Sequence, residues 1–234
     1  GCAMGRSGTD VAKEASDMIL TDDNFATIIH AVKQGRGIFE NIKKTIHFLL
    51  STNIGEIITG LVAFLMGIPT PLLAIQLLWV NLVTDSFPAL ALGVEPIDPD
   101  IMKQKPVKSK NSILSGGMGY NICVEGCFIG VISLLAFVIG IKFFDTTANP
   151  IIGRTMAFCV LSLSQIVHAF NVRSEKSFFK YGLLRNPHMS ISFIVCLILQ
   201  LSVVSIPSIA NVFKTIPLNF TQWTVVSLLS VSIL

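Results

Sequence analysis

The chain has 234 residues, of which 52% are hydrophobic and only 13% are charged, and its formal net charge is +3. Its mean hydropathy is +0.71. Soluble domains carry about 25% charged residues, so this composition excludes an ordinary soluble protein and predicts a membrane protein. The small net charge gives no basis for a nucleic-acid partner, and we expect the lipid bilayer as the main one.

The first 24 residues are polar and resemble soluble protein rather than a cleaved signal peptide. Residues 25–44 follow, with apolar positions that roughly form a helical stripe, and they run without a proline into an apolar span. A single helix from Ala26 to Met66 would be about 60 Å long at 1.5 Å per residue. Since the hydrocarbon core is about 30 Å thick, we expect residues 25–44 to be a cytoplasmic stalk.

Apolar spans then follow one another to the end of the sequence. Residues 67–71 (GIPTP) predict a tight hairpin, so the first two spans should be antiparallel neighbours. From Trp223 to the end only 12 residues remain, against the ~20 that a membrane-crossing helix needs. We therefore expect the last span to be truncated and the chain to be a piece of a larger protein. The six predicted spans are 45–66, 72–92, 118–142, 151–171, 189–206 and 221–234.

Basic residues predict the orientation, because Lys and Arg are enriched in cytoplasmic loops. The loops 93–117 and 172–188 are rich in them, whereas 67–71 has none and 207–220 has only Lys214. Six spans with a cytoplasmic N-terminus satisfy this rule. The basic residues of the two rich loops are Lys103, Lys105, Lys108, Lys110, Arg173, Lys176, Lys180 and Arg185.

Two carboxylates, Glu56 and Asp85, lie inside stretches that otherwise resemble membrane-spanning helices. A charged side chain at the centre of a bilayer costs about 2.5–3.5 kcal/mol on insertion scales, and an ion path is the default interpretation. Asn53 lies three residues before Glu56, on the same helix face. Asn81 is followed by Thr84 at i+3 and Asp85 at i+4, which again predicts one face.

A third polar stripe lies on the fourth span, where Gln165, His168 and Asn171 recur every three residues. Ca²⁺ takes about 6–8 oxygen ligands from carboxylates, amides and carbonyls. The set has no thiol, which argues against zinc or copper, so a hard-cation site is the leading hypothesis. The side chains that offer oxygen are those of Asn53, Glu56, Asn81, Thr84, Asp85 and Gln165.

Pro88 adds a backbone ligand to this hypothesis. Proline has no N–H, so Pro88 cannot bond to the carbonyl of Thr84 four residues earlier. Discontinuous helices of transporters use such freed carbonyls to hold cations. We therefore expect a free carbonyl next to Asp85.

Structural roles stay open for the neutral members of the set. Asn and Thr in membrane helices often form hydrogen bonds between helices, and the same role would suit Gln165 and His168. A hydrogen bond between helices does not require a full charge. The two carboxylates therefore favour a functional site for the set as a whole.

Three segments carry a family resemblance: AMGRSGTDVAKEASDMILTDDNF (3–25), STNIGEI (51–57) and QLLWVNLVTDSFPALALGVEPIDPDIM (76–102). Together they resemble P-type cation-transporting ATPases, and most of all the calcium pumps of the sarco/endoplasmic reticulum type. The resemblance covers nearly the whole chain and is densest over residues 1–110.

The resemblance implies an all-α membrane protein, a polytopic helical bundle with a long cytoplasmic stalk helix. Residues 1–24 would be the C-terminal end of an α/β phosphorylation domain, 25–44 the stalk, and 45–234 the transmembrane domain. The calcium ligands that the resemblance implies fall on Asn53, Glu56, Asn81, Thr84 and Asp85, each matching in type.

Gln165 departs from the family pattern, because the similar calcium pumps have a glutamate at this place. The change removes a negative charge from the implied site. One or two calcium ions per cycle are therefore both open.

The expected function is the transport part of an ATP-driven pump that exports Ca²⁺ from the cytoplasm. The phosphorylated aspartate and the nucleotide domain are not in this sequence, so Mg²⁺ and ATP would act in the parent protein and not bind here. The expected partners are the bilayer and the missing fourth span, actuator and nucleotide domains. A short loop between the third and fourth spans favours a bacterial plasma membrane over an organelle.

Other functions stay open at this point. A pump of the same family could carry Mn²⁺, Na⁺ or H⁺ instead. A gradient-driven transporter or channel would use the carboxylates as a relay without ATP, but the long stalk and the soluble N-terminal piece fit it poorly. A membrane subunit that transports nothing is the third alternative.

Overall fold

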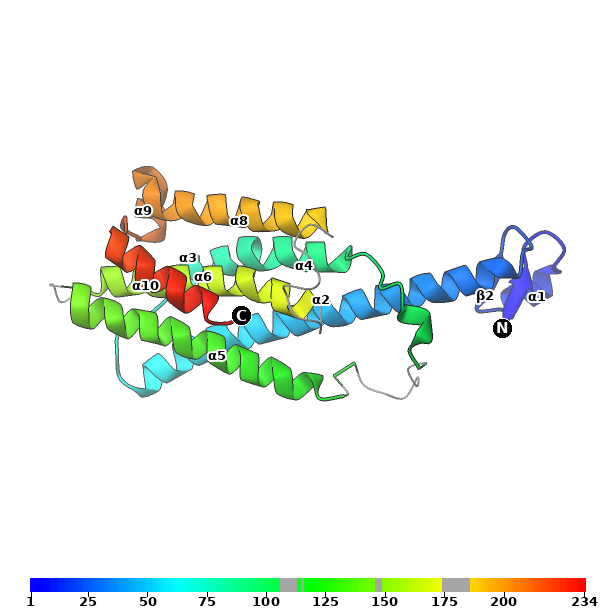
Figure 1. Cartoon of the computed structure of the whole chain (residues 1–234), viewed down its shortest axis with the longest axis horizontal. Coiled ribbons are helices and arrows are strands. Elements are labelled where there is room, and N and C mark those ends of the chain that lie inside the picture. Colours follow the sequence, from blue (N-terminus) through cyan, green and yellow to red (C-terminus); the bar gives the residue numbers. More distant parts are fainter. Residues whose placement is uncertain (106–112, 115, 146–148, 174–185) are drawn as a thin grey trace. The chain divides into compact units, whose positions relative to one another are not determined.

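The computed structural model describes residues 1–105, 113–114, 116–145, 149–173 and 186–234 (Figure 1). It divides into two compact units, Gly1–Glu40 with Pro96–Ser109, and Asn41–Glu95 with Lys110–Leu234. The predicted division into phosphorylation-domain end, stalk and membrane domain stays a prediction. Five basic residues used to predict the orientation lie outside the described residues, namely Lys108, Lys110, Lys176, Lys180 and Arg185.

The first unit contains a small βαβ arrangement. Strand β1 (Cys2–Met4) pairs in parallel with β2 (Met18–Leu20), and helix α1 (Asp10–Glu14) connects them. Thr9 caps α1, since its side-chain oxygen accepts a hydrogen bond of 3.3 Å from the N–H of Ala12. Parallel pairing around a helix is typical of α/β domains.

Helix α2 (Ala26–Leu65) is 40 residues long, which confirms the prediction of one uninterrupted helix. Its start is fixed by Asn24, whose Oδ1 accepts a hydrogen bond of 3.0 Å from the N–H of Ala26. Its end leads into Gly67, whose φ of +65° is a left-handed conformation that glycine adopts without strain. The hairpin predicted for residues 67–71 follows directly.

The second predicted span is one span but not one α-helix. It consists of α3 (Ala74–Trp79), the π-helical segment η1 (Val80–Asp85) and α4 (Ser86–Gly93). The prediction that Asn81, Thr84 and Asp85 share an α-helical face was therefore wrong, because π-helical hydrogen bonds run from i to i+5. Asn81 is exposed, whereas Thr84 and Asp85 are buried.

The remaining elements are all helical. Within the described residues, five helical segments are long and apolar enough to cross a membrane, and α10 is shorter. A short 3₁₀ turn, η2 (Ile101–Lys103), lies in the first unit. The other elements are α5 (Met118–Ile139), η3 (Gly140–Phe144), α6 (Ile151–Arg173), α8 (Pro187–Ser205), α9 (Pro207–Phe213) and α10 (Phe220–Val231).

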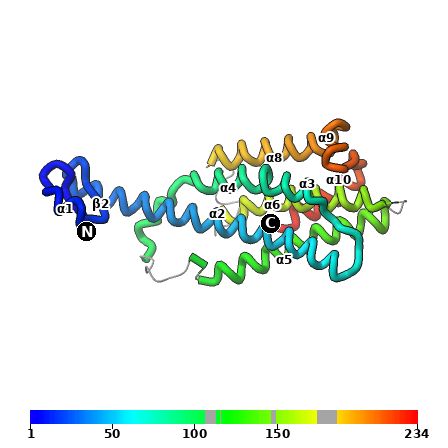
Figure 2. The backbone as a smooth tube through the Cα atoms, turned by 180° about the vertical axis from the view of Figure 1, so that it is seen from behind, coloured from blue at the N-terminus to red at the C-terminus, as the bar shows by residue number. Residues whose placement is uncertain are grey.

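Helix α6 is the central element of the second unit. In its most apolar window 78% of the residues are buried, against 33% in α8. Helices α5 and α10 pack along it, and α5 and α6 lie side by side in Figures 1 and 2. Phe48, Leu92, Phe170 and Met189 form one part of the core, so α2, α4, α6 and α8 share it.

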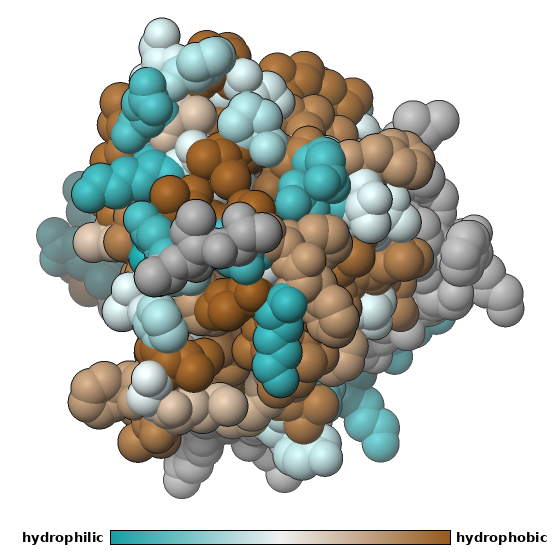
Figure 3. Space-filling view, turned by 90° about the vertical axis from the view of Figure 1, so that its left-hand side faces the viewer, coloured by the Kyte–Doolittle hydropathy of each residue, from teal (hydrophilic) through white to brown (hydrophobic). Residues whose placement is uncertain are grey.

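The outer surface of the second unit is largely apolar. Seen from the left-hand side of Figure 1, hydrophobic residues cover much of the visible face, with hydrophilic ones among them (Figure 3). Phe64, Leu78, Leu90 and Tyr120 are each at least 65% exposed. Large apolar side chains on the outside and polar ones inside are expected of a helical bundle in lipid, so this unit is a helical membrane bundle.

Two glycines of α5 bring its backbone close to α2. A Cβ at Gly126 would lie 2.6 Å from Cγ2 of Ile54 and 2.7 Å from the carbonyl oxygen of Ser51. A Cβ at Gly130 would lie 2.7 Å from Cγ2 of Ile58. Small residues four apart let membrane helices approach closely, so the distance between α2 and α5 depends on these glycines.

The orientation argument counted Arg173 as a residue of the loop 172–188. The structure instead places it at the end of helix α6. Its Nε donates a hydrogen bond of 2.7 Å to Oε1 of Glu95, and both side chains are at most 4% exposed. Asn186 donates to Oε2 of Glu95 over 2.6 Å, and Asn41 donates to the backbone oxygen of Glu95 over 2.7 Å. This buried ion pair therefore links the ends of α4 and α6 with α2 and the start of α8.

Candidate cation site

Four of the six predicted ligands are joined by hydrogen bonds around Glu56. The amide of Asn81 on η1 donates to Oε2 of Glu56 over 2.9 Å, and the amide of Gln165 on α6 donates to Oε1 over 3.4 Å. Thr84 Oγ1 donates to Oε1 of Gln165 over 3.4 Å and lies 3.0 Å from the carbonyl of Val80. Residues far apart in the sequence therefore meet at one carboxylate.

Asp85 lies next to this network but has a different partner. The hydroxyl of Thr52 on α2 donates to its Oδ2 over 3.1 Å. Its Oδ1 is buried and has no hydrogen-bond partner within the residues that the structure describes. A buried carboxylate oxygen without a donor is costly, and a bound cation would satisfy it.

Asn53 is not joined to the other predicted ligands. Its amide donates a hydrogen bond of 2.6 Å to the carbonyl of Leu49 on its own helix. The side chain is partly exposed and stands on α2 one turn before Glu56. Its role as a ligand stays a prediction, and it would have to leave Leu49 to take that role.

The three residues of the polar stripe on the fourth span each have a different hydrogen-bond partner. Gln165 joins the Glu56 network, whereas His168 contacts Ser51 of α2, with 2.8 Å between Nε2 and Oγ. The amide of Asn171 donates to the carbonyl of Ile233 over 2.7 Å. Of the three, only Gln165 is therefore joined to the other predicted ligands.

A pocket of 320 Å³ borders Glu56 on one side. Gly60, Phe64, Ile68 and Leu77 are among its lining residues, and it extends from Glu56 to the hairpin that follows α2. Its walls are mostly apolar, and Glu56 is the one carboxylate among the lining residues. The pocket thus lies between Glu56 and the end of the bundle where that hairpin lies.

The residue types of the site suit a hard cation. The two amide side chains, however, do not point their oxygen atoms toward a common position. The site combines two carboxylates with amide and hydroxyl oxygens, which are the ligands that Ca²⁺ takes. The amides of Asn81 and Gln165 now present N–H groups to Glu56, so both must turn to present oxygen to a cation. Among the described residues no group of three His, Cys, Asp or Glu side chains is placed to hold a metal ion, so any cation here depends on neutral oxygens.

Two polar residues of functional interest do not figure in the predicted set. Thr52 follows the pattern of an ordinary membrane-helix threonine, and only the fold shows that it reaches Asp85. Glu125 is a lone carboxylate in the very apolar span of α5, and the cost of a charge in lipid could have singled it out. Its partners come from two other helices.

Comparison with known proteins places the chain in a family. A family model described as Cation transporting ATPase, C-terminus, matches residues 69–234. A Bacillus cereus protein named Calcium-transporting ATPase 1 is 48% identical over 99% of this chain, and the Calcium-transporting ATPase of Bacillus subtilis is 42% identical over 97%. Calcium-transporting ATPase 2, endoplasmic reticulum-type, of Arabidopsis thaliana is 36% identical over 98%.

The chain spans only part of each relative, namely 28%, 25% and 27% of the three lengths. The matches confirm the resemblance that the motifs of residues 3–25, 51–57 and 76–102 carry. With several helices long and apolar enough to cross a bilayer, the chain is an integral, multi-pass membrane protein. It belongs to the cation-transporting ATPases, and residues 69–234 correspond to their C-terminal part.

Proposed function

We propose that this chain provides part of the cation path of an ATP-driven pump that moves Ca²⁺ out of the cytoplasm. Relatives at 48% and 42% identity are named as calcium-transporting ATPases, which supports calcium as the substrate. ATP and Mg²⁺ would act in the rest of the protein. The expected partners there are the fourth span, the actuator domain and the nucleotide domain.

One observation carries this proposal: the carboxylate of Glu56 accepts hydrogen bonds from Asn81 and from Gln165, which come from two other spans. Asp85 lies on the same π-helical segment as Asn81. Two carboxylates and three neutral side chains with oxygen atoms thus gather where α2, η1 and α6 meet. A purely structural contact would not need either charge, whereas a divalent cation needs both.

In the proposed cycle the cation-free site holds its carboxylates on amide and hydroxyl donors. Calcium arriving from the cytoplasm replaces these N–H and O–H donors, and the amides of Asn81 and Gln165 turn their oxygens toward it. Movement of α2, which carries Asn53 and Glu56, then separates ligands and lowers the affinity. Alternating access requires such a difference in affinity between two states, and the carboxylates take up protons when calcium leaves.

We also propose a cytoplasmic N-terminus and a bacterial plasma membrane. The orientation rests on the distribution of Lys and Arg between alternate loops. The membrane rests on the high identity to bacterial proteins, 48% and 42%, against 36% for the Arabidopsis relative. Cysteine substitutions in the hairpin at residues 67–71, labelled from one side of the membrane, test the orientation.

The central experiment replaces each carboxylate by its amide in the full-length protein. Glu56→Gln and Asp85→Asn keep size and hydrogen bonding but remove the charge, so both should abolish calcium-dependent phosphorylation by ATP. Glu14→Gln, an exposed carboxylate of α1, serves as the matched control. Calcium dependence like that of the wild type in both variants would refute the site.

Ion identity needs a separate measurement. Uptake of calcium-45 into vesicles, with manganese and sodium as competitors, distinguishes the calcium pump from a pump for another cation. Uptake that requires ATP separates either pump from a gradient-driven transporter. ATP-driven uptake of calcium that excess sodium does not reduce is the expected result.

A further inference from the structure

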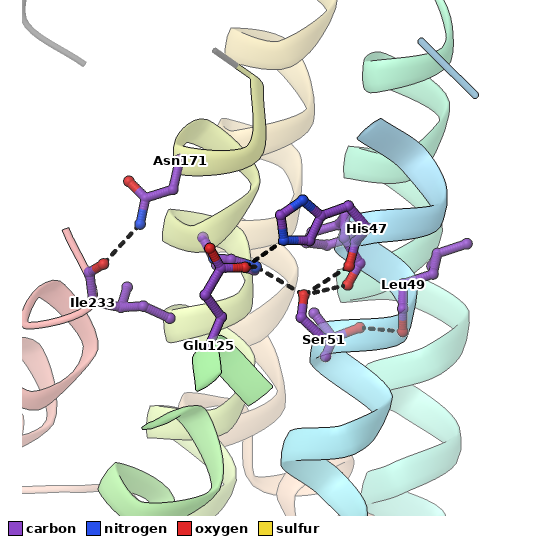
Figure 4. A network of polar contacts seen from close by, with 9 residues as sticks. His47, Leu49, Ser51, Glu125, Asn171 and Ile233 are labelled. Carbon is purple, nitrogen blue, oxygen red and sulfur yellow. Dashed lines mark hydrogen bonds and ion pairs between the residues drawn. The ribbon is translucent and has the colours of Figure 1, made fainter. Parts of the chain in front are cut away.

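A second group of ionisable side chains lies apart from the predicted cation ligands, where α2, α5 and α6 meet (Figure 4). Nε2 of His47 on α2 lies 2.5 Å from Oε2 of Glu125 on α5. Nε2 of His168 on α6 lies 3.6 Å from the same oxygen. One carboxylate oxygen thus faces two imidazoles from two other helices, all within membrane-spanning segments.

The contact between His47 and Glu125 requires a proton between them. If the nitrogen and the oxygen both presented lone pairs at 2.5 Å, they would repel each other. Either the imidazole donates to the carboxylate or the carboxyl donates to the imidazole. With a neutral imidazole and an ionised carboxylate the pair has a net negative charge, which is unfavourable at membrane depth. One further proton from water makes the pair neutral.

His168 is held in one tautomer by Ser51. Ser51 Oγ lies 2.9 Å from the carbonyl oxygens of both His47 and Phe48, so its hydrogen is used there. Its lone pair then accepts from Nε2–H of His168 over 2.8 Å, which fixes the tautomer of that ring. Nδ1 of His168 consequently has a lone pair, and this buried atom has no hydrogen-bond partner in the described parts of the chain.

The other charged groups on these helices and on η1 stand in the following places. On α2, Lys43 and Lys44 stand about one turn before His47. Helix α5 carries no Asp, Glu, Lys, Arg or His besides Glu125. On α6, Arg173 is bound to Glu95, and on η1, Asp85 binds Thr52. Of the described residues, the two histidines are thus the ones paired with Glu125.

One side of the cluster is exposed, and His47 is the third residue of the predicted span 45–66, close to the end of that span that we propose to be cytoplasmic and thus close to water. The side chains of Glu125 and His47 are 32% and 17% exposed, whereas that of His168 is fully buried. A proton can therefore enter or leave at the pair formed by His47 and Glu125. His168 lies on the inner side of the cluster. Its helix, α6, also carries Gln165.

We propose that His47, Glu125 and His168 form a proton-binding site that is separate from the cation ligands. The site takes one proton from water in the arrangement seen here and returns it to water when α2 moves away from α5. The shared proton holds His47 of α2 to Glu125 of α5. By linkage, proton binding and a movement of α2 that separates the pair oppose each other. The proposal rests on the proposed function only for the movement of α2.

Infrared difference spectroscopy on the full-length protein in calcium-free membranes tests the site directly. Changing the pH should produce a difference signal in the carboxyl or carboxylate bands of Glu125, because the proton binds to the pair that includes this group. Glu14→Gln should keep this signal, Glu125→Gln should lack it, and His47→Gln should move it to another pH. The same signal in the wild type and in Glu125→Gln would overturn the proposal.

A second measurement tests the link to transport. A pH-indicating dye reports the protons released when a single turnover of ATP phosphorylates the calcium-loaded protein, which is the step at which α2 moves in the proposed cycle. Glu125→Gln should release about one proton fewer per protein than the wild type, with calcium-dependent phosphorylation retained. Equal release in both would refute the link between the site and the movement of α2.

The two measurements separate the two proposals. The infrared signal needs no transport, so it can appear even if the protein carries no calcium. Calcium-dependent phosphorylation without that signal would refute the proton site alone. If Glu125→Gln does not reach the membrane, His47→Gln and His168→Asn are compared in the same way, and an unshifted signal in both counts against the site.

Discussion

The amide of Gln165 on α6 donates a hydrogen bond of 3.4 Å to Oε1 of Glu56 on α2. Gln165 is fully buried and also accepts from Thr84, so it is fixed at the centre of the candidate site. A glutamate here would place a second carboxylate directly against Glu56. The identity of this one residue thus sets the charge of the site.

Gln165→Glu should therefore change the number of ions bound. Two adjacent carboxylates repel each other, and a second divalent cation would neutralise them. We expect calcium bound per phosphorylated protein to rise, and a rise from one to two would support the charge argument. The measurement combines calcium-45 binding with phosphorylation by labelled ATP. An unchanged ratio would mean that charge at this position does not set the stoichiometry.

The ion pair of Glu95 and Arg173 should show strong coupling in stability. Removing one partner leaves a buried charge without its counter-charge, which costs about 3–5 kcal/mol. Arg173→Met alone should therefore lower the thermal stability of the membrane protein strongly. The double variant Glu95→Gln with Arg173→Met leaves no buried charge and should recover most of the loss. If the loss of thermal stability in the double variant equals the sum of the losses in the two single variants, the coupling is excluded.

Gly126→Ala should push α2 and α5 apart. The new methyl group would meet Ile54 and the carbonyl of Ser51 at 2.6 and 2.7 Å, so a helix has to move. Overpacking of this kind costs about 1–3 kcal/mol. Gly119→Ala on the same helix is the control, since its nearest neighbour would be 4.0 Å away. Thermal unfolding in membranes measures both, and equal stability of the two variants would contradict the close approach.

Asp23 should make the stability of the loop around Arg6 and Ser7 in the first unit depend on pH. Its pKa is lowered, chiefly because the backbone N–H of Arg6 donates to the carboxylate and then because Ser7 does so. Since the folded pKa is the lower one, the stabilisation is complete above the unfolded value of about 3.9. It is lost as the pH falls through the folded value.

Hydrogen exchange at the amides of Arg6 and Ser7 measures this effect. Between about pH 3 and 6, the protection of the wild type, corrected for intrinsic exchange rates, should fall at the acid end. Asp23→Asn keeps an oxygen acceptor and tolerates the positive φ of 51°, but its protection should be lower and independent of pH. Identical pH profiles would exclude the carboxylate as the cause.

Much of this fold was predictable because its signals are local. The absence of proline between Ala26 and Leu65 predicts one long helix, and the GIPTP segment predicts the hairpin after it. Apolar length alone locates the spans. The meeting of Glu56 with Asn81 was also predictable, because a short hairpin makes their helices neighbours.

Other features depend on contacts that spacing does not reveal. The π-helical turn that ends at Asp85 cannot be seen in hydrophobic periodicity, since it changes the hydrogen bonds and not the composition. Thr52 and Glu125 find their partners on different helices. Arg173 looks like a loop cation until Glu95 is seen beside it. Tertiary pairing decided each of these cases.

The π-helical segment Val80–Asp85 carries three predicted ligands and contains one residue more than an α-helix would need for the same turn. A π turn accommodates one residue more than an α turn. Converting it to α-helix would turn Ser86 and all that follows by about 100° relative to Trp79 and shift them by about 1.5 Å. Such a conversion would change the direction of the Asp85 side chain relative to Trp79 without unfolding the span.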